Sequence, residues 1–254
     1  MEKNLGAFDI LKGALAYPFS DRGSFFIGGL VTILYFFYIG IPFILGYQTR
    51  CARHLFRGEE YLPGWGDIGD LIKDGIMTFV ISLVYGLAIS AVVFVFYIPL
   101  IVVALLYGGD GNTMPYWVLA LMLLLVLAMF VVVIPLSMLL WISWMIYADT
   151  SDLGRAINPL NAAKLLRERP LDFVLGLVLQ FIVSFIISIP ILVLYVLAIV
   201  SMLVSEYAVC LVFPLLMIIL PWIVFPTLVS MAYIFARCYQ RATGKVSPGP
   251  TGTV

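Results

Sequence analysis

Five runs of apolar residues, each long enough to cross a lipid bilayer, constrain this chain more than any other feature. They cover residues 25–47, 76–107, 116–148, 173–204 and 207–236. A helix needs about 20 consecutive apolar residues to cross the hydrocarbon core. Because the runs are continuous, they exclude the alternating ten-residue pattern of a membrane β-barrel. We therefore predict an all-α fold, a polytopic transmembrane helix bundle of about five apolar segments.

Prolines and polar junctions add detail to this bundle. Proline removes a backbone donor and bends a helix, so kinks are expected inside the last four runs, at Pro99, Pro135, Pro190, Pro214, Pro221 and Pro226. Amphipathic stretches between the runs predict short interfacial helices. We expect a single integral membrane domain over residues 1–245. The tail, residues 246–254, is rich in Ser, Pro, Gly and Thr and is expected to be disordered.

The 14 lysines and arginines are sorted sharply between the two sides of the predicted bundle. Residues 1–22, 46–75, 149–172 and 237–245 contain all of them, whereas the turns near Gly108–Pro115 and Ser205–Glu206 have none. Basic residues stay in the cytoplasm during insertion. We therefore predict a multi-pass protein of the plasma membrane whose C-terminus is cytoplasmic.

The first run, Phe25–Tyr47, is compatible with two topologies. Its length suffices for one ordinary crossing. However, Gly40 and Pro42 near its middle can break the helix, and the basic N-terminal segment prefers the cytoplasm. We lean towards a re-entrant hairpin that turns near Gly40–Pro42 and returns to the face it entered.

The stretch from Gly46 to Gly75 carries a motif. It contains Gly46-Tyr47, Arg50, Arg53, Arg57-Gly58-Glu59, Leu62-Pro63, Trp65, Asp67 and Asp74-Gly75, preceded upstream by Tyr17-Pro18-Phe19 and Asp21. This pattern resembles the DUF4013 family of archaeal and bacterial membrane proteins. The resemblance implies a prokaryotic multi-pass membrane protein, and it brings no activity, substrate or catalytic residue with it.

Four positively charged or titratable side chains follow helical spacing at the end of the first run. They are Arg50, Arg53, His54 and Arg57. Spacing of i, i+3, i+4 and i+7 places them on one helix face, with Leu55 and Phe56 off this stripe and able to touch the membrane. Two interpretations stay open: the stripe binds anionic lipid headgroups, or it is an anchor that pairs with nearby acids.

Other polar features are weaker. Asp67, Asp70 and Asp74 share a helix face and could bind a divalent cation, but capping and the helix dipole explain acids here more simply, so we predict no metal site. Gly108-Gly109-Asp110-Gly111-Asn112 lacks the lysine of a phosphate loop and is interpreted as a turn. Gln180, Ser184 and Ser188 form a polar stripe that either lines a polar path or joins helices.

The cores of the last four runs contain no Asp, Glu, Lys, Arg or His, and no nucleophile motif occurs anywhere in the chain. The net charge of zero gives no reason to expect nucleic acid binding. We predict a non-enzymatic protein without cofactors, a scaffold whose partners are the bilayer, membrane proteins or further copies of itself. Two alternatives are a permease component for a neutral or lipid-like solute and an enzyme acting on lipid headgroups.

Overall fold

The computed structural model describes residues 6–107, 115–204 and 208–245, and these residues form helices without any strand. The predicted all-α class is confirmed. The elements in chain order are α1 (Ala7–Ala16), the 3-10 helix η1 (Tyr17–Phe19), α2 (Arg22–Phe36), α3 (Ile41–Phe56), α4 (Ile68–Tyr107), α5 (Tyr116–Thr150), α6 (Leu153–Ile157), α7 (Pro159–Glu168), α8 (Pro170–Val204) and α9 (Ala208–Thr243). The predicted turns at Gly108–Asn112 and Ser205–Glu206 and the predicted disordered tail lie outside the described residues.

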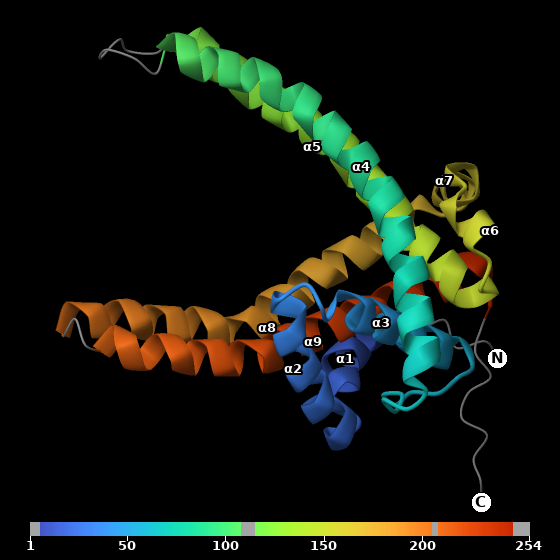
Figure 1. The fold of residues 1–254 in the computed structure, drawn as a ribbon. Helices are drawn as coiled ribbons and strands as arrows, with labels where there is room; N and C mark the ends of the chain where they lie inside the picture. Colours follow the sequence, from blue (N-terminus) through green and yellow to red (C-terminus); the bar gives the residue numbers. More distant parts are fainter. Residues whose placement is uncertain (1–5, 108–114, 205–207, 246–254) are drawn as a thin grey trace, which may run out of the picture.

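Four helices, α4, α5, α8 and α9, are long and apolar enough to cross a membrane. With the shorter apolar helix Arg22–Tyr35 they account for the predicted set of about five apolar segments. Consecutive long helices pair as two hairpins, α4–α5 and α8–α9, which diverge from a common end (Figure 1). At that end α1–α3, α6 and α7 surround the ends of the long helices, and we call this region the body. Each long helix contains at least one proline, and the α4–α5 hairpin is visibly bent.

The first apolar run is broken where the sequence predicts a break. Helix α2 ends at Phe36 and α3 starts at Ile41, with Pro42 in its first turn. Between them Tyr38 has a positive φ of 63°, and the Gly40 amide donates to the Leu34 carbonyl at 2.9 Å. A single straight helix over residues 25–47 is thereby excluded. The return of the chain to the membrane face it entered stays a prediction.

Helix α2 lies against α9 through two glycines. A side chain at Gly28 or Gly29 would collide with the rings of Phe225 or Trp222, at 2.2 Å in both cases. Asp21 starts α2 by accepting hydrogen bonds from the amides of Gly23 and Ser24. The bare glycine surface lets α2 approach α9 more closely than it could with any side chain there.

The end of α3 reverses the chain through a Schellman turn. Gly58 has a φ of 87°, its amide donates to the Leu55 carbonyl, and the Glu59 amide donates to the His54 carbonyl. This turn directs residues 58–67, which we call the strap, back along the body. The predicted amphipathic helices are present in α1, which buries Ile10 and Ala14, and in α7, which buries Ala162.

Candidate functional site

The motif residues meet where α3 crosses the start of α4. A Cβ atom on Gly46 would lie 1.9 Å from the Leu71 carbonyl oxygen, and one on Gly75 would lie 1.7 Å from the Pro42 carbonyl oxygen. Both contacts are to backbone, so only glycine allows the two helices to approach this closely. The hydroxyls of Thr49 and Thr78 hydrogen-bond across the same crossing at 2.8 Å.

Arg53 and Asp74 form a bidentate ion pair beside this crossing. Nη2 of Arg53 donates to Oδ1 of Asp74 at 2.9 Å, and Nη1 pairs with Oδ2. The hydroxyl of Tyr147 on α5 also donates to Oδ1 at 3.0 Å, and its ring lies 5.5 Å from the guanidinium carbon. Arg53 further donates from Nε to the Ala148 carbonyl at 3.2 Å. One charge pair therefore joins α3, α4 and α5.

Arg50 holds the strap in place. Its guanidinium donates to the carbonyls of Gly64, Gly66 and Asp67, which lie at the end of the strap. The ring of Trp65 stacks on Tyr47 with centroids 4.1 Å apart, and the Tyr47 hydroxyl donates to the Pro63 carbonyl at 2.8 Å. Motif residues far apart in the chain thus bind one another.

A second charged cluster, which the sequence did not predict, fixes the strap to α9. Arg237 is only 3% exposed, and its Nη2 donates to Glu60 at 2.6 Å while Nη1 donates to Gln240 at 3.1 Å. Gln240 in turn donates to the Leu55 carbonyl at 3.0 Å. A basic residue directly after a long apolar run was the available signal, but that signal equally fits an exposed membrane anchor.

The predicted basic stripe is divided between buried pairs and solvent. Arg50 and Arg53 are engaged as described, and Nδ1 of His54 lies 2.6 Å from Oε2 of Glu59. Arg57 is exposed, and within the described residues its side chain makes no hydrogen bond or ion pair. This geometry agrees with the interpretation as an anchor paired with acids, and a headgroup role for the stripe stays a prediction.

The expectation that Leu55 can touch the membrane is wrong, whereas Phe56 is partly buried. Leu55 is completely buried, and Phe56 packs against Tyr239 with ring centroids 5.6 Å apart. Both residues lie beside α9, since Gln240 donates to the Leu55 carbonyl and Phe56 contacts Tyr239, so this end of α3 meets protein.

His54 gives the body a dependence on pH. Burial lowers the pKa of His54 below its usual 6.5, and this outweighs the raising effect of Glu59. The unfolded chain therefore binds more protons than the folded chain near and below pH 6.5. We expect the free energy of unfolding to fall as the pH is lowered from 7 to 5.5. Thermal unfolding of the His54→Gln variant should show a smaller loss of stability over this pH range. An equal loss in both proteins would show that His54 does not cause the pH dependence.

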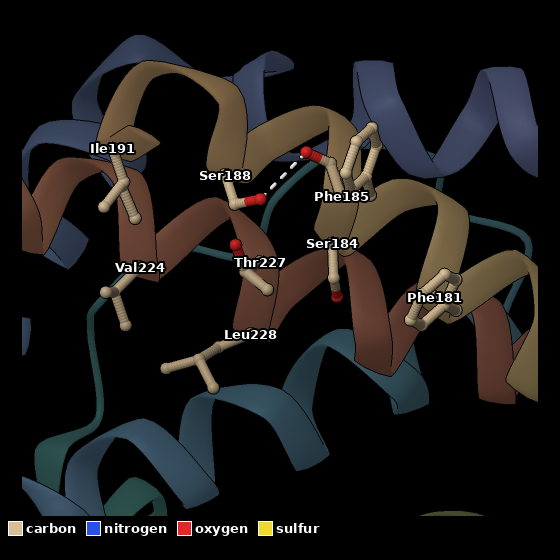
Figure 2. A pocket seen from close by; sticks show the side chains of 8 residues that line it. All are labelled: Phe181, Ser184, Phe185, Ser188, Ile191, Val224, Thr227 and Leu228. Atoms are coloured by element: carbon tan, nitrogen blue, oxygen red, sulfur yellow. Dashed lines mark hydrogen bonds between the residues drawn. The ribbon is translucent and has the colours of Figure 1, made fainter. Parts of the chain in front are cut away.

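A pocket of about 420 Å³ lies between α8 and α9. Its walls are mainly apolar, and three hydroxyl side chains, Ser184, Ser188 and Thr227, lie among them (Figure 2). Ser188 donates to the Phe185 carbonyl at 2.9 Å, and Ser184 accepts from Gln180 at 2.8 Å. Two residues of the predicted polar stripe thus line this pocket, while Gln180 supports Ser184 from the preceding turn.

Comparison with known proteins identifies one family. The family described as proteins of unknown function (DUF4013) matches residues 27–196, about two thirds of the chain. The chain belongs to the DUF4013 family. No curated protein and no solved structure matches it.

In this DUF4013 protein the charged groups of the body are arranged as separate pairs. Within the described residues, Asp74, Glu59, Glu60, Asp149 and Asp172 each lie against a different basic side chain, and no three metal-ligating side chains cluster. Cys51 is completely buried, and burial raises the pKa of its thiol, which keeps it protonated and a weak nucleophile. The geometry thus assigns these residues to holding the helices together.

Proposed function

We propose that this DUF4013 protein is a non-enzymatic membrane scaffold whose hairpins associate with lipid and with membrane protein partners. The observation that carries this proposal is the separation of the two hairpins. Helix α5 joins α9 near the body, where Trp141 stacks on Phe235 at 5.0 Å and Tyr239 donates to Asp149 at 3.1 Å. Along their apolar lengths the hairpins diverge (Figure 1).

The exposed apolar surfaces of the two hairpins must therefore be covered by lipid or by other helices. Phe130 on α5 and Phe181 on α8 are both exposed, as are many neighbouring apolar side chains. Lipid covers such faces in a bilayer, but small and hydroxyl side chains also allow another helix to pack against them. A rigid body that holds two uncharged hairpins apart suits a protein that gathers partners between or around them.

The motif supports the same proposal. Gly46, Gly75, Arg53, Asp74 and Arg50 are fully accounted for by the helix crossing and the strap. Five carboxylates of the described body, those of Asp74, Glu59, Glu60, Asp149 and Asp172, are each held by a basic side chain, which favours a structural role for them over catalysis on lipid headgroups. We extend the proposal to a plasma-membrane location with the body and C-terminus in the cytoplasm, because the basic segments gather at the body.

The pocket between α8 and α9 favours a second candidate function. Apolar walls with a few hydroxyls are suited to a neutral or lipid-like solute. Oε1 of Gln180 is buried and accepts no hydrogen bond from the described residues, so it offers an acceptor one turn from Ser184. A permease component for such a solute would use this pocket.

Photocrosslinking from two matched positions distinguishes the candidates. A benzophenone amino acid replaces Phe130 on the outer face of α5 in one variant and Phe181 beside the pocket in the other. The scaffold proposal expects discrete protein adducts from position 130 in native membranes, identified by mass spectrometry. Lipid adducts alone from position 130, together with capture of a small solute at position 181, would reject the scaffold in favour of the permease. Turnover of labelled lipid by the purified protein would contradict both.

A further inference from the structure

Helix α7 presents two different faces. Ala162 is completely buried, and Leu165 and Leu166 pack against the core, so this face is fixed on α5 and its neighbours. The opposite face carries Leu160, Lys164 and Arg167 at i, i+4 and i+7, all of them exposed. The packing of one face thus determines that the basic residues point away from the protein.

The position of α7 in the chain fixes its depth relative to the membrane. It ends at Glu168, and α8, a candidate membrane span, begins at Pro170. Arg169 lies between them, only about 6 Å of helix rise before the apolar side chain of Phe173. Leu171, 81% exposed, stands at the same junction. Cations this close to the start of a span lie at the level of the lipid headgroups.

The basic side chains of this junction also have no polar partner among the described residues. Within the described residues, Lys164, Arg167 and Arg169 make no side-chain hydrogen bond or ion pair. By contrast, Arg53, Arg237 and Lys245 each hold a carboxylate. The α7–α8 junction therefore has cations that are free to bind an external partner, whereas Arg50, Arg53 and His54 on α3 are engaged within the protein.

We propose that the basic face of α7 (Leu160, Lys164 and Arg167), together with Arg169 and Leu171 at the α7–α8 junction, binds the anionic headgroups of the leaflet in which α8 begins. The exposed leucines enter the headgroup boundary, and the cations pair with phosphate groups around them. Charge complementarity and direct continuity with a membrane span select a lipid leaflet as the occupant. The inference is independent of the scaffold proposal, since it concerns only how the body rests on the bilayer.

The test compares two triple variants of the full-length protein in detergent. One is K164Q/R167Q/R169Q, and the matched control is K12Q/R22Q/K73Q, which removes three other exposed cations that lack ion pairs in the described structure and lie outside the α3 stripe. Native mass spectrometry measures the dissociation constants of phosphatidylglycerol and phosphatidylcholine. We expect the preference for phosphatidylglycerol to fall by at least about tenfold in the α7 variant, because three cations are removed and each one near an anionic leaflet contributes several-fold. It should persist in the control.

A third variant, K164R/R167K/R169K, keeps the charge and should keep the preference. The thermal midpoints of all variants should stay close to that of the wild type, because these side chains make no internal contacts that folding needs. An unchanged preference in the α7 variant, or an equal loss in both triple variants, would overturn the proposal. Loss in the control alone would also overturn it and would place the headgroup contact at Lys12, Arg22 and Lys73.

Discussion

Replacing Gly75 with alanine is expected to force α3 and α4 apart and to lower the free energy of unfolding by about 3 kcal/mol. The added methyl group would lie 1.7 Å from the carbonyl oxygen of Pro42. That oxygen belongs to the backbone in the first turn of α3, so no side-chain rotation relieves the collision. The displacement would also strain the Thr49–Thr78 hydrogen bond and the Arg53–Asp74 pair, which lie beside the crossing.

Gly86 is the matched control for this substitution. It lies on the same helix, and a Cβ atom there meets nothing within 4 Å. Gly86→Ala should be neutral or stabilising by up to about 1 kcal/mol, because alanine is the better helix former. Thermal or SDS-induced unfolding of both purified variants measures the difference. If Gly75→Ala unfolds at the same point as Gly86→Ala, the close crossing of α3 and α4 is not as described.

The sequence is sufficient to predict those features that depend on neighbouring residues. The length of the apolar runs predicts the long helices, and Gly40 with Pro42 predicts the break before α3. Basic residues sort with the segments that form the body because insertion itself responds to local charge. The amphipathic pattern likewise predicts α1 and α7. These are all properties of short windows of the chain.

The partners of the polar residues depend on the tertiary arrangement, and here the sequence falls short. Helical spacing correctly groups Arg50, Arg53 and His54 on one face, but it does not tell whether that face meets water, lipid or another helix. Likewise Asp67, Asp70 and Asp74 appear equivalent in a helical projection, yet Asp74 alone of the three is buried. Its partner lies 21 residues away on a helix that crosses α4, and its second donor, Tyr147, lies 73 residues away.

The same uncertainty affects the opposite face of α3. Leu55 was expected to be able to touch lipid because it lies off the basic stripe, but it is completely buried and its carbonyl accepts from Gln240 on α9. Arg237 is the converse case, a basic residue at the end of an apolar run that the fold buries. Hydropathy measures how unfavourable a side chain is in water. In a membrane protein an apolar side chain is equally well placed in lipid or in the protein interior, so hydropathy does not distinguish the two.

Asp74 supplies the second large effect. We expect Asp74→Asn to lower the free energy of unfolding by about 3–5 kcal/mol, because it leaves the charge of Arg53 in a largely buried site without its counterion. Asp74 is 7% exposed and accepts hydrogen bonds from both α3 and α5, so its replacement loosens three helices together.

The control is Lys245→Gln, which removes an ion pair whose lysine side chain is 60% exposed. Its loss should cost at most about 1 kcal/mol. The double variant R53Q/D74N should recover part of the loss, since no buried charge is then left alone. Unfolding of the four proteins in detergent checks this, and a D74N variant as stable as K245Q would show that the pair does not hold the body together.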